Sequence, residues 1–427
     1  MTTHQTVDTV VVGAGHAGLA VSRLLTDAGR DHVVLDRGRI AERWRTERWD
    51  SLRLLTPTWM TRLPGWYPGG RDPEGFLSAA ELTTYLERYA ASFDAPIHAG
   101  TNVRRVAPAR GGVGYDVRTD TGTWRTRHVV VATGPHGPNR VPVPLADLRA
   151  AELVPSSRYR NPGQLADGGV LVVGASASGV QIADELARAG REVTLAVGRH
   201  TRVPRRYRGL DLFWWLESTG RLGRTIDDVT EPLRARHEPS LQLVGRAERS
   251  DASDLDLSTL SQRGVRLVGR LQGLDGDRVA LDDGLRARTV EADRALCRLL
   301  GSLDEYAART GLARELLAPT RPRPVDPAPA PGWLDLRAER IGTIVLAAGH
   351  RPDHSWLALP VTGPDGAIRQ YRGVTSAPGI YVVGQRFQHR RDSSFIDGAR
   401  HDARDVVTHL VTGALPAAAV ASEEPAA

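Results

Sequence analysis

The stretch that decides the fold is Val7-Asp-Thr-Val-Val-Val-Gly-Ala-Gly-His-Ala-Gly18, a β-branched run that leads into a glycine-rich turn. The run predicts a buried parallel strand, and residues 16–28 have the apolar spacing of a helix that ends before Gly29. Such a turn lets backbone N–H groups approach a pyrophosphate at the positive end of the helix. The start of the chain therefore predicts a dinucleotide-binding unit.

The same pattern returns as Gly174-Ala-Ser-Ala-Ser-Gly179, after the strand-like run 170–173 and before a helix expected over 180–189. Serine replaces the middle glycine, and this small side chain still permits close approach of a ligand. Two such turns in one chain predict an α/β fold with two Rossmann-like dinucleotide-binding domains. They also indicate electron transfer between two bound dinucleotides.

The residues at the end of the strand after each helix differ in charge. The first such strand ends at Asp36, whose carboxylate can accept hydrogen bonds from an adenosine ribose. The second ends at Arg199-His200, and cations at this position suit a 2′-phosphate. We therefore expect NADPH rather than NADH in the second site, with Arg202, Arg205 and Arg206 as further phosphate candidates.

Proline-rich segments divide the chain. Prolines accumulate over 135–144 and again over 319–331, which indicates two crossings between domains. We therefore expect the second domain to be inserted into a discontinuous first domain. The predicted ranges are 1–160 for the first segment of the first domain, 165–335 for the inserted domain, 336–413 for the return of the first domain, and 414–427 for a disordered tail. Further helices are expected over 79–93, over 290–317 and from about residue 397, and strands within 103–131, 193–197, 341–349 and 380–384.

Composition excludes several classes of protein. The 427 residues contain no apolar run of about 18 residues and no apolar leader, so we expect a cytoplasmic protein without a membrane partner. The net charge is +6, but all 56 basic residues are arginine and acidic residues are interspersed among them, which argues against a nucleic-acid partner. The single cysteine, Cys297, cannot form the Cys-x-x-Cys pair of a disulfide reductase, and we interpret it as a small apolar residue on a helix.

Four motifs together resemble the flavin-containing monooxygenase-like flavoproteins of the group B type. They are the turn at 13–18, Glu42-Arg-Trp-Arg45, Arg48-Trp-Asp-Ser-Leu-Arg-Leu54 and Ala132-Thr-Gly134. The resemblance covers most of the chain and implies an FAD domain with an inserted NADPH domain. It further implies that hydride passes from NADPH to FAD. Molecular oxygen then forms a C4a-(hydro)peroxyflavin, which oxygenates a nitrogen, sulfur or carbonyl group of a small-molecule substrate.

The resemblance and the motifs together assign candidate site residues. For FAD they are Gly13, Gly15, His16, Ala17, Gly18, Asp36, Arg37, Arg43, Trp44, Leu54, Val103, Thr133, Gly134, Gly384, Ser394 and Phe395. For NADPH they are Gly174, Ser176, Ala177, Ser178, Gly179, Arg199, His200 and Gly349. The helix expected near Asp397 would aim its positive end at the flavin ring. Leu55 and Thr56 are the flavin-proximal positions at which catalysis is expected.

Aromatic residues provide candidates for substrate contact. Trp59, Trp66, Phe213 and Trp214 lie in segments expected near the flavin or the domain cleft, and they would favour an apolar or aromatic substrate. Packing in the core or between the domains is the alternative interpretation of these four side chains.

Two positions depart from the family pattern. Leu55 stands where family members place an asparagine beside the peroxyflavin, and Pro155 stands where their fingerprint has histidine. A leucine side chain cannot hydrogen-bond a peroxide. A flavin-dependent dehydrogenase or oxidase, and a non-catalytic redox-sensing protein, therefore remain alternatives to a monooxygenase. The sequence is also compatible with a homodimer.

Two other kinds of site, a hydrolase nucleophile and a metal centre, have partial matches in the sequence. The hydrolase nucleophile pattern Gly-x-Ser-x-Gly requires glycine where this chain has Ser178, and no ordered acid and histidine follow it. His350 and His354 have the spacing of metal ligands on a helix, but they flank Pro352 in an expected loop. We interpret both histidines as structural or flavin-proximal, and expect no metal site.

Overall fold

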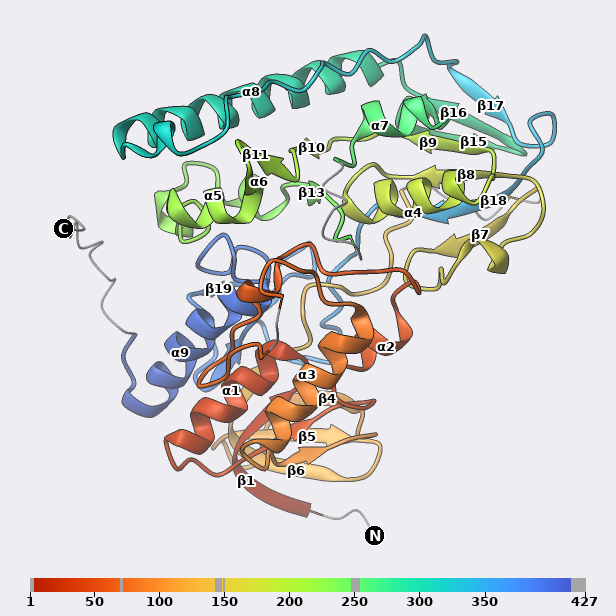
Figure 1. Cartoon of the computed structure of the whole chain (residues 1–427). Helices are drawn as coiled ribbons and strands as arrows, with labels where there is room; N and C mark the ends of the chain where they lie inside the picture. Colours follow the sequence, from red (N-terminus) through yellow and green to blue (C-terminus); the bar gives the residue numbers. More distant parts are fainter. Residues whose placement is uncertain (1–3, 70–71, 143–147, 149, 247–253, 416–427) are drawn as a thin grey trace.

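The computed structural model describes residues 4–69, 72–142, 148, 150–246 and 254–415, and it shows a mixed α/β molecule with two lobes (Figure 1). Both ends of the described chain belong to the first lobe, and the middle of the chain builds the second lobe. Most of the predicted tail, 414–427, lies outside the described residues. Among the helices of the described ranges, none is long and apolar enough to cross a membrane.

The first lobe is built on a nine-stranded sheet with the order β19-β20-β21-β6-β1-β2-β3, to which β4 and β5 are attached beside β6. Its strands are β1 (His4–Val12), β2 (His32–Leu35), β3 (Ile97–His98), β4 (Val103–Pro108), β5 (Tyr115–Thr119), β6 (Thr123–Val131), β19 (Gln370–Tyr371), β20 (Val374–Thr375) and β21 (Ile380–Val382). Strands β21, β6, β1, β2 and β3 run parallel. The helices are α1 (His16–Asp27), α2 (Glu42–Thr46), η1 (Thr58–Met60), α3 (Ala79–Ala91) and α9 (Ile396–Thr412).

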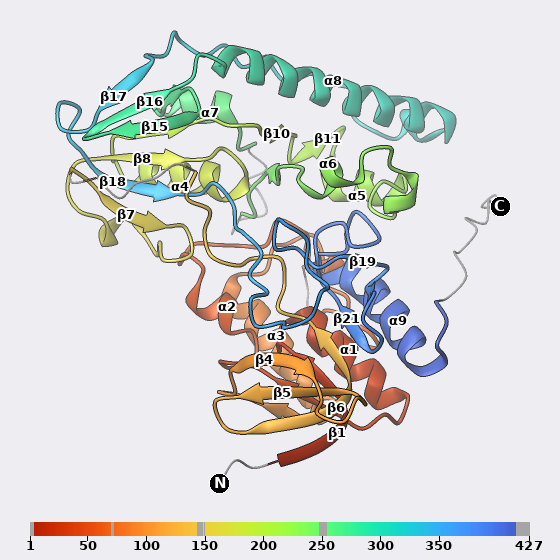
Figure 2. The ribbon, with the colours of Figure 1, turned by 180° about the vertical axis from the view of Figure 1, so that it is seen from behind.

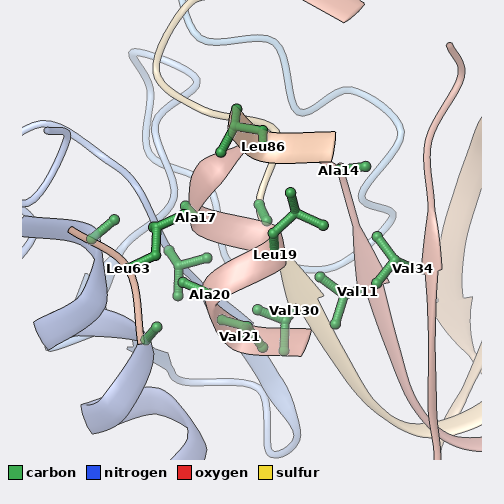
Figure 3. Packing of buried hydrophobic residues seen from close by; sticks show 14 of the residues in the cluster. Val11, Ala14, Ala17, Leu19, Ala20, Val21, Val34, Leu63, Leu86 and Val130 are labelled. Carbon is green, nitrogen blue, oxygen red and sulfur yellow. The ribbon is translucent and has the colours of Figure 1, made fainter. Parts of the chain in front are cut away.

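One part of the core of the first lobe lies between this sheet and helix α1, and a second buried cluster contains Val10 and Val12 of β1. Figure 3 shows Leu19, Ala20 and Val21 of α1 beside Val11 of β1 and Val130 of β6, and all of them are buried. The β-branched run of β1 forms this core because a parallel strand covered on both faces can bury every side chain. Helix α9 packs against α1, which brings the C-terminal part of the described chain back to its start.

The second lobe has a five-stranded parallel sheet with the order β14-β9-β8-β18-β7. Its strands are β7 (Glu152–Pro155), β8 (Gly169–Val173), β9 (Val193–Ala196), β14 (Arg266–Val268) and β18 (Ile341–Leu346). An antiparallel sheet of β15 (Leu271–Asp275), β16 (Arg278–Leu281) and β17 (Trp333–Asp335) lies beside it. Two short pairs join β10 (Thr201–Arg202) to β13 (Leu241–Gln242), and β11 (Arg206–Tyr207) to β12 (Leu210–Asp211).

In the second lobe the longest helix runs along the outer edge, and shorter helices lie against the five-stranded sheet and to one side of it (Figures 1 and 2). The helices of this lobe are η2 (Pro162–Gln164), α4 (Ala177–Arg188), α5 (Leu212–Ser218), η3 (Ile226–Asp228), α6 (Pro232–Arg236), α7 (Leu257–Gln262), α8 (Leu285–Arg309) and η4 (Leu312–Arg314). The long helix α8 was expected over 290–317. It begins earlier and ends at Arg309, since Gly311 follows with a positive φ of 78° that starts the turn η4.

The predicted domain ranges differ from the sheet membership at two strands. β7 and β18 fall in the ranges 1–160 and 336–413 that were assigned to the first domain, but both strands pair in the second sheet. Each strand is a short apolar run beside a crossing segment, and only the hydrogen bonds to β8 or β18 show which sheet it joins. The second sheet therefore spans 152–346.

Candidate functional site

A cavity of about 940 Å³ opens where the carboxyl ends of β1, β2 and β6 face the second lobe, and we call it the interlobe cavity. In the sheet, β1 lies between β2 and β6 and pairs with both in parallel. The strand order reverses at β1, and ligands bind at such points in open parallel sheets. The cavity lies at the upper end of the usual size range of about 300–1,000 Å³ for ligand pockets. It is large enough for an extended ligand.

Most of the predicted FAD positions line this cavity. They are Gly13, Gly15, His16, Ala17, Asp36, Arg37, Arg43, Trp44, Leu54, Val103, Thr133, Gly134, Gly384 and Ser394. Gly18 and Phe395 are absent from its wall, because Gly18 faces Gly13 and Phe395 packs on Phe213. Of the two expected catalytic positions, Leu55 lines the cavity and Thr56 does not.

The second glycine-rich turn reaches the same cavity. Ala177 and Ser178, at the start of α4, belong to its wall together with Gln181 and Ser240. The other predicted NADPH positions do not line it: Gly174, Ser176, Gly179, Arg199, His200 and Gly349. The cavity thus contains residues from both strand–turn–helix units, one from each lobe.

The glycines of the first turn have different tasks. A Cβ on Gly13, which has a φ of +115°, would lie 2.6 Å from the Ala132 carbonyl oxygen, and a Cβ on Gly18 would lie 1.9 Å from that of Gly13. Both positions therefore need glycine so that the backbone can pack. A Cβ on Gly15 would meet nothing within 4 Å, so this glycine faces open space in the cavity wall.

The second turn repeats this division. A Cβ on Gly174 would lie 2.5 Å from the Ala347 carbonyl oxygen, and one on Gly179 would lie 1.8 Å from that of Gly174. Ser176 takes the middle position, at which the first turn has the open Gly15. Serine is accommodated there because only the outer two positions are packed against backbone.

Asp36 fixes the shape of the first turn. Its Oδ2 accepts the backbone N–H of Ala14 at 2.7 Å, and its Oδ1 accepts that of Gly38 at 2.8 Å. Each carboxylate oxygen can accept a further hydrogen bond, so the group can still bind a ribose hydroxyl from the cavity. Asp36 thus connects the turn after β1 with the end of β2.

His16 supplies a polar atom that has no partner among the described residues. Its Nε2 is buried without a hydrogen bond, and the side chain lines the cavity at the start of α1. Burial lowers the pKa of His16 to about 4, so the ring is neutral near pH 7. Buried polar atoms without a partner are uncommon, and this one belongs to a residue of the cavity wall, where a bound ligand could complete its hydrogen bonding.

One wall of the cavity combines arginine with histidine. The rings of His136 and His350 meet edge to face with their centroids 4.9 Å apart, and the Arg48 guanidinium lies 4.9 Å from the centre of the Trp44 ring. Burial is the main cause that lowers the pKa of His350 to about 4, lowers that of His136 well below its usual value, and lowers that of Arg48 to about 10. The wall therefore carries guanidinium charge beside two neutral imidazole rings.

Sequence reasoning missed Arg48 and His136 as site residues. The signal that could have identified them was their position, because Arg48 opens the motif that ends at Leu54 and His136 follows Ala132-Thr-Gly134 directly. His350 and His354 both line the cavity. Among the described residues, no group of three or more histidine, cysteine, aspartate or glutamate side chains is arranged to hold a metal ion.

The predicted role of Arg202 and Arg205 as phosphate partners is wrong. Arg202 is buried and paired with Asp256 and Asp293, and Arg205 is buried and paired with Asp211, so neither guanidinium is available to a 2′-phosphate. The cost of leaving a buried charge without a partner explains why these arginines turn inward to carboxylates.

Arg199 and His200 lie apart from the cavity at the end of β9. Arg199 is exposed, and its Nη2 donates to the backbone carbonyl of His237 at 2.6 Å. His200 is buried, with Nδ1 donating to the Gly198 carbonyl at 3.1 Å. Arg199 is thus the more accessible of the two predicted phosphate partners.

The four aromatic substrate candidates do not line the cavity. Phe213 is 1% exposed and belongs to a buried apolar cluster, against which Trp59 also packs. Trp66 packs on Tyr85 and Tyr89, and Trp214 packs on Trp215. The structure favours the alternative interpretation, in which these side chains serve packing. Cys297 lies on α8 as expected, but it is exposed rather than part of an apolar face.

Comparisons with known proteins give consistent matches. Residues 10–209 match the family model described as pyridine nucleotide-disulphide oxidoreductase. An uncharacterized CzcO-like oxidoreductase of Geobacillus kaustophilus is 30% identical over 412 residues, which cover 95% of this chain and 98% of that protein. The rice indole-3-pyruvate monooxygenase YUCCA4 is 32% identical over 430 residues, which cover 94% of this chain and 87% of that protein.

Solved structures show a similar fold. A flavin-containing monooxygenase from Stenotrophomonas maltophilia superposes with a TM-score of 0.64 at 20% identity, over 95% of this chain and 98% of that one. The OTEMO complex with FAD and NADP superposes with a TM-score of 0.53 at 17% identity, over 95% of this chain and 86% of that one. At these identities the likeness concerns the fold.

Proposed function

The chain belongs to the flavin-containing monooxygenase-like oxidoreductases, and on that premise we propose that it is an NADPH-dependent FAD enzyme of the monooxygenase type. The observation that carries this proposal is the interlobe cavity, whose wall contains Gly13 and Gly15 from one lobe and Ala177 and Ser178 from the other. Two dinucleotides that enter one cavity from two turns can bring their redox-active rings together.

FAD would be held by the first lobe. The open space at Gly15, the free acceptor capacity of Asp36 and the unpartnered Nε2 of His16 all fit this cofactor. Arg43 and Trp44 would extend the same wall. The buried start of α9, at Ile396, directs its N-terminal end toward the neighbouring cavity residue Ser394, where the helix would favour negative charge on a reduced ring.

NADPH would be held by the second lobe. Ala177 and Ser178 would present the positive end of α4 to the pyrophosphate, and Arg199 would contact the 2′-phosphate from the surface. The second sheet supports a domain range of 152–346 for this site, inserted between the two parts of the FAD domain. The homodimer and the cytoplasmic location remain predictions.

The chemistry that the bound cofactors supply is hydride transfer from NADPH to the flavin, followed by activation of dioxygen to oxygenate a small substrate. The chain itself binds the two rings, excludes water with Trp49, Leu52 and Leu54, and offers the charge of Arg48 to groups in the cavity. The neutral His136 and His350 can each donate or accept a proton in a hydrogen bond to a ligand.

One observation bears on the oxidase alternative. Leu55 lines the cavity where an amide would be needed to hydrogen-bond a peroxide, and its side chain offers no donor. An oxidase would release hydrogen peroxide for each NADPH consumed. The comparisons favour neither this alternative nor a redox-sensing protein.

The experiment starts from the purified protein reconstituted with FAD. We expect flavin absorbance that bleaches on anaerobic addition of NADPH, and much more slowly with NADH. On admission of oxygen, the ratio of hydrogen peroxide to NADPH should fall when an apolar or aromatic ketone or thioether is added. A ratio that stays at one with every such acceptor would favour the oxidase, and failure to bind FAD would contradict the whole proposal.

A further inference from the structure

Arg205 of the second lobe reaches into the first lobe. Its side chain is 2% exposed, and its Nη1 donates to the backbone carbonyl oxygen of Leu55 at 2.8 Å. Its Nη2 donates to Asp211 Oδ1 at 2.6 Å. The same Asp211 oxygen accepts the backbone N–H of Phe213 at 2.8 Å and so caps helix α5.

Two aromatic rings hold the guanidinium between the lobes. The Arg205 Cζ lies 4.8 Å from the centre of the Phe76 ring in the first lobe and 5.4 Å from that of Phe213 in the second. Phe213 meets the ring of Phe395 at 6.0 Å, edge to face, directly after the cavity residue Ser394. The planar guanidinium suits this place because it can stack on rings and donate in two directions at once.

The second lobe touches the same segment at another point. A Cβ on Gly245 would lie only 2.2 Å from the Leu54 carbonyl oxygen, so the backbone at 245 packs directly against residue 54. On the other side, the N–H of Leu54 donates to the Leu77 carbonyl at 2.8 Å within the first lobe. Residues 54 and 55, which both line the cavity, are therefore held from both lobes.

Stability alone does not account for this arginine. Replacing a buried ion pair by apolar side chains of similar volume is often neutral or stabilising, so a retained pair is weak evidence for a role in stability. The pair Arg205–Asp211 does supply something that an apolar pair cannot. It directs one donor at a single carbonyl group, 150 residues away in the chain, and so sets the position of that carbonyl.

We propose that Arg205 is a positioning residue that fixes the Leu55 backbone at the cavity wall and couples the segment around α5 to the flavin-proximal position. The proposal rests on the proposed function for the identity of the bound cofactor, but the coupling itself belongs to the chain. In this role Arg205 shapes the wall of the cavity and does not bind a phosphate.

The test compares Arg205→Met with Arg202→Met. Arg202 is also buried, at 4% exposure, and lies in the same segment, but its partners Asp256 and Asp293 both belong to the second lobe. In the apoprotein we expect hydrogen exchange of the backbone amides of residues 52–58 to be at least tenfold faster in Arg205→Met. Arg202→Met should leave exchange in that segment within twofold of the unchanged protein.

Arg205→Lys provides a second variant if the methionine variant fails to fold. Lysine keeps a charge beside Asp211, but a single ammonium cannot reproduce the fork that serves both Asp211 and Leu55. We expect this variant to fold and to show the same faster exchange at 52–58. Unchanged exchange in Arg205→Lys, or equal acceleration in the Arg202 and Arg205 variants, would overturn the proposal.

A readout on the FAD-loaded protein separates this proposal from the proposed function. The visible circular dichroism of the bound flavin should change in the Arg205 variants and not in Arg202→Met, while the KM for NADPH stays within twofold. If the unchanged protein binds no FAD, the proposed function fails, and the exchange data on the apoprotein still decide the role of Arg205.

Discussion

Asp402 on helix α9 shows how burial controls charge at a single residue. Its side chain is buried, and burial, with Asp392 and Asp405 nearby, raises the pKa of Asp402 to about 8. In an unfolded chain an aspartate titrates near pH 4, so between about pH 4 and pH 8 the folded state keeps a proton that the unfolded state has released. The stability that this proton provides is complete below about pH 4 and is lost as the pH rises toward 8.

Asp402→Asn should therefore remove this part of the pH dependence of the unfolding free energy. Relative to the variant, the unchanged protein is expected to lose about 1.4 kcal/mol of unfolding free energy per pH unit between pH 5 and 7, and less per unit as the pH approaches 8. Urea unfolding of both proteins at several pH values measures this difference, and titration of the histidines is common to both. Parallel pH profiles would contradict the protonated state of Asp402.

Arg199 provides a test of cofactor preference. Because only NADPH carries the 2′-phosphate, Arg199→Ala should raise the KM for NADPH about tenfold, in line with a partly exposed charge-assisted hydrogen bond of about 1.5 kcal/mol, and leave that for NADH unchanged. Steady-state kinetics with both cofactors measure the effect. Arg298→Ala, which removes an exposed arginine of helix α8 that is not among the phosphate candidates, is the control. Equal losses for both cofactors would show that the 2′-phosphate binds elsewhere.

At the scale of the element, the first strand–turn–helix unit separates packing from binding. In Gly18→Ala the new Cβ would meet the Gly13 carbonyl, so the apoprotein should lose about 1–3 kcal/mol of unfolding free energy. In Gly15→Ala nothing lies within 4 Å of the new Cβ, so the loss should stay below about 1 kcal/mol.

For FAD binding, by contrast, Gly15→Ala should have the larger effect of the two variants. The methyl group in Gly15→Ala would enter the cavity wall, and we expect about tenfold weaker FAD binding in a fluorescence titration of the folded apoprotein. Normal FAD affinity in Gly15→Ala would mean that the pyrophosphate does not approach this turn.

Helices and strands follow local signals to different degrees. α1 and α3 occupy almost their predicted ranges, because apolar spacing and end signals coincide, as in the capping box of Ser78 and Glu81. α5 was not predicted. Its position depends on Asp211, which caps the helix and at the same time accepts a hydrogen bond from Arg205. Short elements of this kind are stabilised by packing more than by their own sequence.

At the scale of the whole molecule, an ion-pair network joins the lobes beside α9. Arg62 donates to both carboxylate oxygens of Asp397, at 2.6 and 2.8 Å, and to Glu217 of α5 at 2.9 Å. Asp397 is only 6% exposed, and hydrogen bonding to it raises the pKa of Arg62. This network lies close to the apolar cluster that contains Trp59 and Phe213.

Arg62→Met should loosen the contact between the lobes. We expect a loss of about 1–3 kcal/mol in unfolding free energy, toward the lower end because Arg400 still donates to Asp397. Denaturant unfolding measures this value. Arg23→Met, which removes a pair with Asp27 on the surface of α1, should cost less than about 1 kcal/mol. Equal losses of unfolding free energy in Arg62→Met and Arg23→Met would show that the Arg62 network does not stabilise the contact between the lobes.

The sequence by itself determined the two strand–turn–helix units, most of the cavity residues of the first lobe and the absence of a cysteine pair. These features depend on local backbone sterics and spacing, since a Cβ at Gly18 or Gly179 would clash with the carbonyl oxygen of Gly13 or Gly174 within its own strand–turn–helix unit. Only the tertiary structure decided that β7 and β18 join the second sheet and that Phe213 packs rather than faces a ligand. It also decided that Arg202 and Arg205 turn inward. The physical reason is that a side chain's role depends on desolvation and on partners that lie far away in the chain, such as Leu55 for Arg205, and no local pattern records them.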